Sequence, residues 1–309
     1  MRAAPASTTP ASPDAPSAPG PARVGAAGVL TMIGSGLSNQ TGAAIGSLAF
    51  PVLGPVGVVA VRQYVAAVVL TAVGRPRLRR LTWWQWRPVL ALAVVFGTMN
   101  LSLYTAIDRI GLGLAVTLEF LGPLTVALAG ARRRTDAGCA VVAAAGAVTL
   151  MRPQPSTDYV GLGLGLLAAC CWASYILLNR TVGRRVPGAQ GSAAASLVSA
   201  VTFLPIGAVV ALRHPPTLAA VGCAVAAGVL SSAVPYLADL LTLRRVPAQA
   251  FGLFMSVNPL LAALVGRTVL GQRLGVLEWT AIAAIVAANA TSMLTRDRSG
   301  DGSGDGSRD

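Results

Sequence analysis

The sequence has very little charge for its length. Charged residues make up 11% of the 309 positions, hydrophobic residues make up 54%, and lysine is absent, so that all 24 basic residues are arginine. Soluble domains carry about 25% charged residues, and this shortage excludes an ordinary water-soluble globule. The composition therefore predicts a polytopic membrane protein in contact with the lipid bilayer.

Residues that bind metals or carry out catalysis are also scarce. The single histidine, His214, lies beside two prolines in a short connection, and the four cysteines lie in apolar runs without the spacing of metal ligands. The sequence contains no HExxH, GxSxG, phosphate-binding loop or CxxC pair. These absences predict a protein that is not an enzyme, has no catalytic residues and needs no metal or cofactor.

The formal net charge of +13 would suit a nucleic-acid partner. The arginines, however, form short clusters between apolar runs, where they set membrane topology. With the N-terminus inside, 18 of them fall in inner segments and 5 in outer segments. This bias predicts both termini in the cytoplasm and no nucleic-acid partner. In the first large inner loop, an interfacial aromatic anchor is expected at Trp83, Trp84 and Trp86.

Ten apolar runs lie between two polar tails, each close to the ~20 residues that cross the hydrocarbon core. Their approximate bounds are 26–49, 55–74, 88–106, 110–131, 136–151, 160–179, 190–212, 216–243, 247–268 and 274–295. Residues 1–25 are rich in Ala, Pro and Ser and are expected to form a disordered cytoplasmic tail. Residues 296–309 are expected to form a flexible cytoplasmic tail. The predicted fold class is all-α, with ten transmembrane helices.

The two halves of the chain are related by a weak internal repeat. An offset of 136 residues aligns Pro123 with Pro259, and the succession of a loop arginine, an apolar run and a proline recurs. Five spans per half make the two halves enter the membrane from opposite sides, which is the inverted arrangement that permits alternating access. We therefore expect a first five-helix repeat at 26–151 and a second at 160–295. Coincidence in a low-complexity apolar sequence is the alternative.

The stretch from Gly111 to Pro123, GLGLAVTLEFLGP, places one carboxylate, Glu119, inside an apolar run. Hydration cannot stabilise that charge within the bilayer, so Glu119 must have a partner or a function. Pro123 has no N–H to donate to the carbonyl of residue 119, which leaves a second polar group at the same depth. The glycines of the stretch favour a helix packed against its neighbours over a lipid-facing one.

Polar residues and prolines interrupt several other runs. Such groups usually face the interior of a helix bundle and mark substrate or proton pathways, which predicts a central cavity that binds substrate or couples transport to protons. The residues predicted to line this cavity are Glu119, Arg62, Gln40, Asn100, Tyr236, Asp239 and Asn258, with helix-breaking prolines at Pro123, Pro235 and Pro259.

Simpler roles are the alternative for three of these residues. Asn100 would equally well join two helices by a hydrogen bond. Asp239 would form an interfacial ion pair with Arg244, and Arg62 would extend outward to the headgroups. As a set, the charges suit an α-amino acid, because Glu119 or Asp239 would bind its ammonium group and Arg62 its carboxylate. A buried carboxylate would also carry a proton, which would give proton antiport.

Four stretches match the pattern of a known family. They are SNQTGAAIGSLAFPVLGPVGVVAVR at 38–62, MNLSLYTAIDRIGLGLAVTLEFLGPLTVAL at 99–128, ACCWASYIL at 169–177 and SSAVPYLADLLTLRRVPAQAFGLFMSVNPLLAAL at 231–264. The chain resembles the drug/metabolite transporter superfamily in its ten-helix EamA-type branch, and within that branch the bacterial threonine/homoserine exporters. With the matching run lengths, the resemblance covers nearly all of residues 26–295.

The resemblance implies two inverted five-helix repeats around a central cavity, alternating access, and export of threonine, homoserine or related metabolites across the bacterial inner membrane in exchange for protons. A homo-oligomer is compatible with it. The exporter pattern has Glu at the positions of Asn258 and Asp239, and the loss of a carboxylate at 258 puts the substrate in question. Export of a drug or secondary metabolite by the same fold is therefore the alternative, and a non-transporting membrane scaffold is a further one.

Overall fold

The computed structural model of the chain describes residues 26–110, 112–131, 134–151, 156–213, 215–243 and 275–301, together with the short pieces 257–258, 260–261 and 264–265. Every regular element in these ranges is helical, which confirms the all-α prediction. Five of the described helices are long and apolar enough to cross a membrane. They are α2 (Phe50–Gly74), α3 (Trp83–Ile110), α6 (Tyr159–Arg185), α7 (Gln190–Arg213) and a continuous helix at Leu218–Thr242.

The last of these five helices has three parts in succession. They are α8 (Leu218–Gly228), a π-helical turn η2 (Val229–Ala233) and α9 (Val234–Leu243), which together we call the broken helix. The other described elements are α1 (Ala26–Ser47), α4 (Leu112–Ala129), α5 (Arg134–Met151), α12 (Val276–Asp301) and a short 3-10 turn η1 (Leu78–Arg80).

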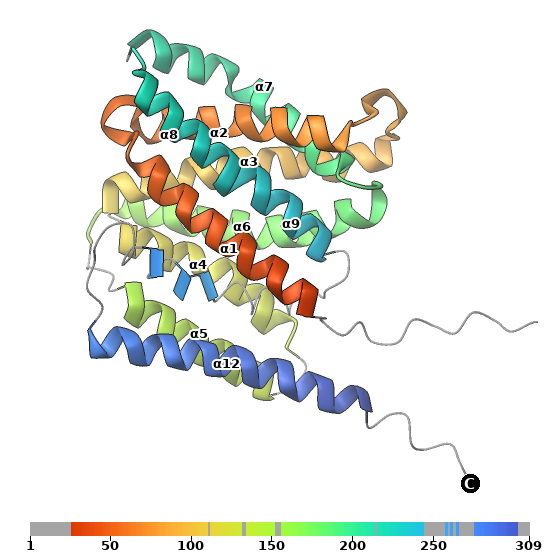
Figure 1. The fold of residues 1–309 in the computed structure, drawn as a ribbon, viewed down its shortest axis with the longest axis vertical. Coiled ribbons are helices and arrows are strands. Elements are labelled where there is room, and N and C mark those ends of the chain that lie inside the picture. The colour runs from red at the N-terminus through yellow and green to blue at the C-terminus, as the bar shows by residue number, and fades with distance from the viewer. Residues whose placement is uncertain are drawn as a thin grey trace, which may run out of the picture.

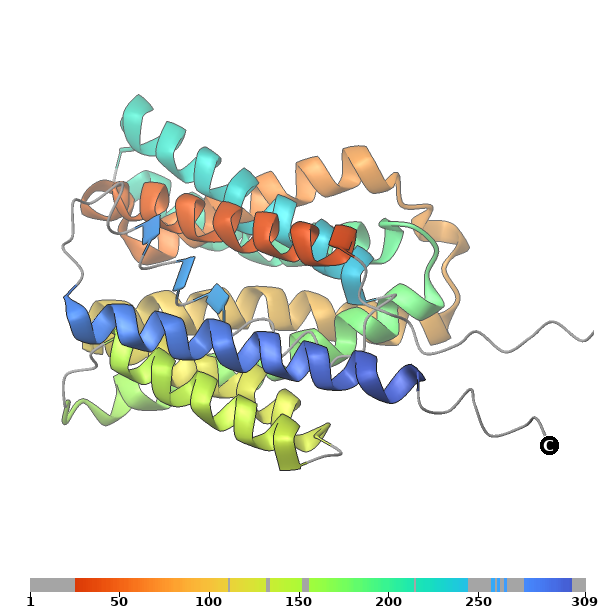
Figure 2. The same ribbon diagram turned by 60° about the horizontal axis from the view of Figure 1, so that its bottom comes forward.

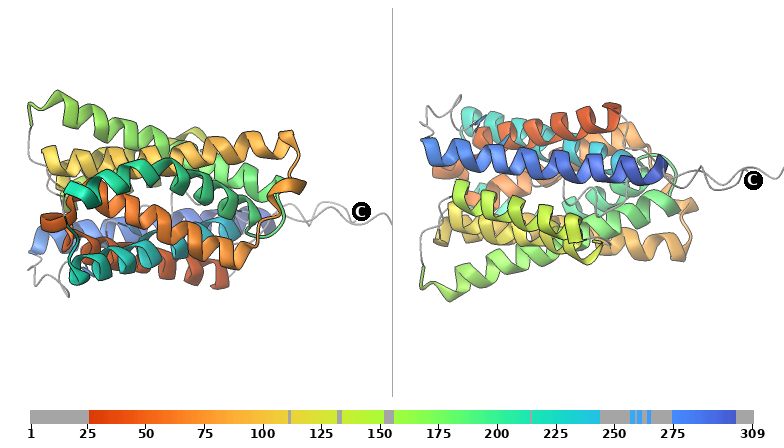
Figure 3. Two further views of the ribbon diagram at one scale, coloured as in Figure 1. Left: turned by 90° about the horizontal axis from the view of Figure 1, so that it is seen from above. Right: turned by 90° about the horizontal axis from the view of Figure 1, so that it is seen from below.

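The helices form a bundle in which their long axes are roughly aligned (Figure 1, Figure 3). α2 packs against α7 and α3 packs against α6, whereas α1 packs against all three parts of the broken helix. α12 packs along α5 at one edge of the bundle (Figure 2). The described pieces near 260 connect these groups, because the Leu261 side chain lies against Gly36 of α1 and Leu260 packs against core residues of α12.

The two ends of the bundle differ in charge. One end carries the start of α1, the α2–α3 and α6–α7 connections and the end of α12 (Figure 1). We call it the arginine-rich end, because the two connections and the helix turns beside them contain Arg75, Arg77, Arg79, Arg80, Arg87, Arg184 and Arg185. At the opposite end, the described residues include Arg109 at the end of α3 and Arg213 at the end of α7.

Several helix boundaries differ from the predicted bounds. α3 begins at Trp83 rather than at 88, so the three tryptophans of this region lie in its first turn and not in a loop. The amide N–H of Thr82 donates to Oε1 of Gln85 at 3.1 Å, which is one half of a capping box and begins the helix there. α6 likewise continues to Arg185 rather than ending at 179.

The beginning of α2 and the end of α12 also differ from prediction. α2 begins at Phe50 rather than at 55, and Gly54 adopts a φ of 65°, which only glycine adopts readily and which kinks the helix ahead of Pro55. α12 ends at Asp301, so residues 296–301 are helical rather than part of a flexible tail. Outside the described residues lie the predicted tail at 1–25, residues 302–309 and most of the predicted run at 247–268.

Candidate functional site

Three buried aromatic rings form the centre of the bundle. Phe96 of α3 stacks on Tyr236 of α9, with ring centroids 4.1 Å apart and an interplanar angle of 2°. Tyr175 of α6 lies tilted against both, at 5.8 Å from Phe96 and 6.0 Å from Tyr236. Because stacked and tilted rings contribute energy beyond the area they bury, this cluster fixes α3, α6 and α9 relative to one another.

Asn100 is one turn from Phe96 on the same face of α3. Its Nδ2 donates to the Phe96 carbonyl at 2.8 Å and to the Tyr236 hydroxyl at 2.9 Å. Both residues are predicted site residues, and the structure brings them into direct contact. Asn100 thus joins α3 to α9 by a hydrogen bond, and its amide oxygen is left for another donor.

Asp239 lies one turn from Tyr236 on α9 and is 7% exposed. Its carboxylate accepts from the Tyr175 hydroxyl at 2.8 Å and from Ser35 Oγ of α1 at 3.3 Å. Asn179 Nδ2 in turn donates to Tyr175 at 3.4 Å. The described partners of Asp239 are thus hydroxyl groups, and the carboxylate joins α1, α6 and α9 in one hydrogen-bonded network. The alternative partner Arg244 lies outside the described residues.

Arg62 of α2 is buried, with 5% of its surface exposed, which argues against the alternative in which it extends outward to the headgroups. Its Nε donates to Ser232 Oγ at 3.1 Å, and its Nη2 donates to the Ser231 carbonyl at 3.0 Å. Nη1 donates to the Tyr104 hydroxyl of α3. The guanidinium therefore connects α2 and α3 to the π-helical turn, and it uses three of its five N–H groups to do so.

The π-helical turn explains why Arg62 finds a carbonyl there. The N–H of Val234 donates to the Val229 carbonyl, five residues back. Pro235 has no N–H. A residue with an N–H at position 235 could donate to the Leu230 carbonyl, five residues back, or to the Ser231 carbonyl, four residues back, and both carbonyls lack this donor. Side chains replace it: Ser38 Oγ of α1 donates to the Leu230 carbonyl at 2.7 Å, and Arg62 donates to the Ser231 carbonyl. The predicted break at Pro235 is thus a site where α1 and α2 bind the backbone of the broken helix.

Glu119 lies near the middle of α4 and is 8% exposed. No hydrogen bond joins its carboxyl group to a described residue, and Arg62 is the described cation whose charge acts on it. Its helix is held tightly, since a Cβ on Gly122 would lie 2.3 Å from the Ala169 carbonyl oxygen of α6. Pro123 is buried within the same helix. The structure therefore gives Glu119 a fixed, buried position without a hydrogen-bond donor among the described residues.

Three predicted residues remain. Asn258 is 7% exposed, and its Oδ1 lies 2.8 Å from the place that a Cβ on Gly36 of α1 would occupy. Gln40 of α1 is half-buried and forms no hydrogen bond with a described residue through its side chain. Pro259 lies outside the described residues. Sequence reasoning missed the hydroxyl groups of Ser35, Ser231 and Ser232, for which the only signal was their position inside apolar runs.

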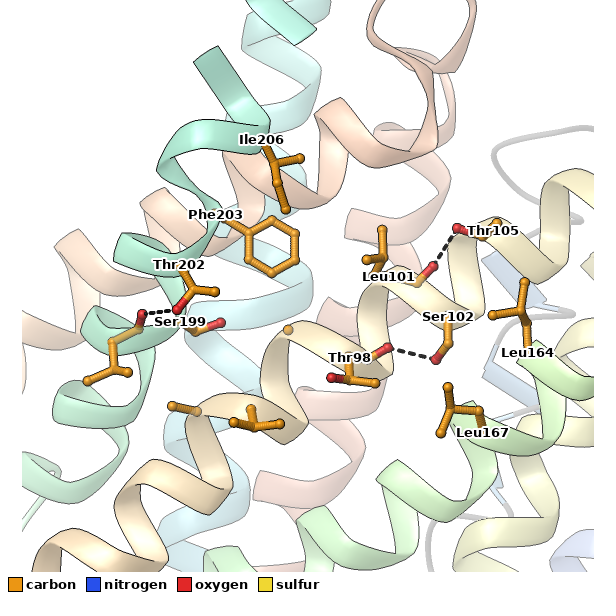
Figure 4. A pocket seen from close by; sticks show the side chains of 14 residues that line it. Thr98, Leu101, Ser102, Thr105, Leu164, Leu167, Ser199, Thr202, Phe203 and Ile206 are labelled. Carbon is orange, nitrogen blue, oxygen red and sulfur yellow. Dashed lines mark hydrogen bonds between the residues drawn. The ribbon is translucent and has the colours of Figure 1, made fainter. Parts of the chain in front are cut away.

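The described residues also line a cavity of about 470 Å³ between α3, α6 and α7 (Figure 4). None of the predicted site residues lines it. The hydroxyl groups of Ser102, Thr105 and Thr202 donate to carbonyls of their own helices, as the dashed lines in Figure 4 show. The walls of this cavity are therefore mostly apolar. It is separate from the buried side chains that we call the polar cluster, which are Arg62, Asn100, Glu119, Tyr236 and Asp239.

Comparison with known proteins identifies the family. The EamA-like transporter family matches residues 159–293. The threonine/homoserine exporter RhtA of Salmonella typhimurium strain LT2 is 38% identical over 273 residues, which are 86% of this chain and 91% of that protein. This chain belongs to the EamA-like transporter family. The resemblance found in the sequence is thereby confirmed, and the chain is a member of a family of polytopic membrane transporters rather than an enzyme.

Two further relatives and one solved structure are also similar to this chain. RhtA of Escherichia coli strain K12 is 37% identical over 261 residues, which cover 84% of this chain and 88% of that protein. The uncharacterized transporter YwfM of Bacillus subtilis is 24% identical over 66% of this chain. One solved crystal structure matches with a TM-score of 0.70 over 87% of this chain and 98% of the other, at 19% identity, which supports the fold alone.

Proposed function

We propose that this EamA-like protein exports threonine, homoserine or related small amino acids across the bacterial plasma membrane. The observation that carries the proposal is the 38% identity to a threonine/homoserine exporter over 86% of the chain. The identity extends well beyond the residues that the family model matches. The buried charges of the polar cluster supply the chemistry that an amino-acid substrate needs.

The polar cluster offers partners for both charges of a zwitterion. Arg62 has two N–H groups that no hydrogen bond with a described residue uses, and these would bind a substrate carboxylate. Glu119 would bind the ammonium group, since its carboxyl has no hydrogen-bond donor among the described residues. Asp239 is a weaker candidate for this role, because Tyr175 and Ser35 already donate to both of its oxygens.

Export would be coupled to proton entry. A carboxyl group buried in a bilayer is costly as an anion unless a cation is near, and the cation that acts on Glu119 is Arg62. Glu119 would bind the substrate ammonium only as an anion, so a proton on Glu119 and the substrate would exclude each other. Protonation of Glu119 would then drive substrate release, and substrate binding would drive loss of the proton, which is the coupling that antiport requires.

We further propose that the chain consists of two inverted five-helix repeats, at 26–151 and 160–295. The packing supports this arrangement. The proposed axis would exchange α1 with α6, α2 with α7, α3 with the broken helix, and α5 with α12. Under this exchange, the α3–α6 contact becomes the contact between the broken helix and α1. The α2–α7 and α5–α12 contacts each become themselves. Such an exchange is what a pseudo-two-fold axis in the membrane plane produces, and it permits alternating access to a site between the halves.

Both termini would lie in the cytoplasm. The start of α1 and the end of α12 lie at the arginine-rich end (Figure 1), and cytoplasmic connections carry the excess of arginine in membrane proteins. A tag fused to either terminus and tested for accessibility in intact cells would check this orientation.

The export function is tested by loading proteoliposomes with labelled threonine or homoserine and following their release. We expect release to accelerate when the outside is made acidic relative to the lumen, because inward proton movement drives outward substrate movement whichever way the protein is inserted. The acceleration should be lost when an ionophore collapses the gradient. The Gly163→Ala variant serves as a folded control, since Gly163 has open space around it. Release that ignores the gradient would contradict antiport, and no release would contradict the amino-acid substrate.

Export of a less polar compound is the second candidate function. Asn258 supports it, because an amide stands where the exporter pattern has a carboxylate and the site would carry one negative charge fewer. Cells that express the protein and gain resistance to a hydrophobic toxin, while proteoliposomes release no threonine or homoserine, would favour this candidate over the first.

A further inference from the structure

Two connections that are far apart in the sequence form one cationic surface at the arginine-rich end. The α2–α3 connection and the first turns of α3 carry five exposed arginines, and the last turn of α6 carries two more. They are Arg75, Arg77, Arg79, Arg80, Arg87, Arg184 and Arg185, which we call the arginine platform. The sequence has no Asp or Glu at 71–90 or at 180–193, so no acidic residue of these segments neutralises the platform.

Hydrogen bonds hold the two halves of the platform together. Gln85 Nε2 donates to the Arg185 carbonyl at 2.8 Å, and the amide N–H of Arg77 donates to Gln190 Oε1 at 3.3 Å. The guanidinium of Arg185 lies over the ring of Trp84, 4.7 Å from its centroid. The charges are thus fixed beside one another by contacts between segments 100 residues or more apart. Topology alone would require the charges but not these contacts.

The platform also has an aromatic margin. Trp83 is 70% exposed and Trp84 is 61% exposed, and both lie in the first turn of a membrane-spanning helix. Tryptophan in such positions sits at the headgroup level, where its ring contacts acyl chains and its N–H remains among polar groups. The platform therefore lies at the depth at which lipid phosphates lie.

We propose that the arginine platform binds the headgroups of anionic phospholipids, with guanidinium groups donating to phosphate oxygens. Arginine matches phosphate geometry with paired N–H donors. Clusters of four to eight basic residues beside a membrane-spanning helix attract anionic lipid. This binding is separate from transport of a substrate through the bundle and does not depend on the proposed function.

The test compares two brominated lipids with identical acyl chains, one with a phosphatidylglycerol headgroup and one with a phosphatidylcholine headgroup. Each is titrated into phosphatidylcholine vesicles that contain the full chain, and quenching of tryptophan fluorescence reports which lipid lies beside the exposed tryptophans. Trp83 and Trp84 are the more exposed, at 70% and 61%, and Trp279 is 46% exposed. We expect brominated phosphatidylglycerol to quench at a mole fraction about threefold or more lower than brominated phosphatidylcholine. The preference should fall as salt is added, because salt screens exposed charges. Equal quenching by the two lipids would overturn the proposal without any variant.

Variants then assign the preference to the platform. Arg79→Gln with Arg80→Gln removes two exposed charges that make no side-chain hydrogen bond with a described residue, and it should reduce the preference at least twofold. Arg79→Lys with Arg80→Lys keeps the charge and should retain most of it. The matched control for a single charge is Arg213→Gln, which removes an exposed arginine at the opposite end of the bundle and should leave the preference unchanged, whereas Arg79→Gln alone should lower it. An equal loss in the control would show that net charge, and not this surface, attracts the lipid.

Discussion

The side-chain amide of Asn100 donates to the hydroxyl of Tyr236 at 2.9 Å, and the two residues are 136 positions apart. The same offset aligns Pro123 with Pro259 in the sequence. A residue can touch its counterpart in the other repeat only near the axis that relates them. In the proposed arrangement of inverted repeats, this hydrogen bond therefore marks the pseudo-two-fold axis, and the Asn100 and Tyr236 side chains lie where a substrate site between the halves would be.

A double-mutant cycle tests how strongly this axis contact joins the halves. We expect Asn100→Leu and Tyr236→Phe to show a coupling energy of about 0.6 kcal/mol, the usual value for a hydrogen bond between membrane helices. The contribution is small because Asn100 keeps its bond to the Phe96 carbonyl when the Tyr236 hydroxyl is removed. The measurement is the free energy of unfolding in mixed micelles. Additive effects of the two substitutions would mean that the contact does not stabilise the fold.

Replacement of Arg62 should loosen the broken helix. Arg62→Gln leaves the Ser231 carbonyl without its donor, and loss of a buried charged hydrogen bond costs about 2 kcal/mol. Arg62→Lys should recover only part of this, because an ammonium group cannot reach Ser231, Ser232 and Tyr104 in the fork geometry of a guanidinium. Hydrogen exchange of the amides at 229–234 checks the prediction. Exposed Arg213→Gln is the control, and unchanged exchange in the Arg62 variants would contradict the positioning role.

Neutralising Glu119 should abolish gradient-driven release from proteoliposomes. Glu119→Gln keeps the size of the side chain but removes the group that would gain and lose a proton, so release should fall to the rate of empty vesicles under an imposed gradient. Because Glu119 makes no hydrogen bond with a described residue, the variant should still insert and unfold at the wild-type detergent concentration. A Gln variant that releases substrate normally would remove Glu119 from the mechanism.

The α4–α6 contact should tolerate no side chain at Gly122. A Cβ there would lie 2.3 Å from the Ala169 carbonyl oxygen and 3.1 Å from the Ala173 nitrogen, both of which are backbone atoms of α6. Gly122→Ala must therefore separate the two helices, and overpacking of this kind costs about 1–3 kcal/mol. Gly163→Ala on α6 has no atom within 4 Å of the new Cβ and should stabilise by up to ~1 kcal/mol through helix propensity. Equal unfolding free energies for the two variants would contradict the close contact.

The first turn of α6 should respond to acid. Asp158 accepts from the Gly161 amide at 2.9 Å and lies 3.0 Å from Arg109 Nε. The Gly161 amide first, and the Arg109 guanidinium after it, hold the pKa of the Asp158 carboxyl below its usual value. Because the folded pKa is the lower one, this stabilisation is complete above about pH 4 and is lost as the pH falls through the folded pKa. The difference in melting temperature between the wild type and Asp158→Ala should therefore be present at neutral pH and shrink in acid; a difference independent of pH would contradict it.

The helices could be predicted from sequence because each apolar run must cover a bilayer, but their ends could not. The start of α3 at Trp83 depends on the bond between Thr82 and Gln85, and aromatic residues beside an arginine cluster are as typical of a loop as of a helix. The kink at Gly54 is similar. Its glycine is one of 34 in the chain, and the left-handed φ that it shares with Gly188 among the described glycines cannot be seen in the sequence.

The candidate site could be predicted in its charges and not in its contacts. Arg62, Glu119 and Asp239 stand out in the sequence because a buried charge is costly in lipid. Their partners do not, because Ser35, Ser231 and Ser232 are small residues that pack in membrane helices without further significance. Ser35 and Asp239 are 204 residues apart in the sequence, and Arg62 and Ser232 are 170 residues apart. No local sequence pattern therefore connects either pair.

Of the two carbonyls that Pro235 leaves without a backbone donor, the one of Ser231 accepts from Arg62. Arg62 and Pro235 should therefore have been retained together during evolution. An ancestor that gained the proline without the arginine would carry an unpaired carbonyl in the bilayer, and one that gained the arginine alone would bury a cation that lacks this acceptor. We therefore expect relatives to keep or lose the two together. Among aligned family members, positions 62 and 235 should covary more strongly than either does with the residues next to it.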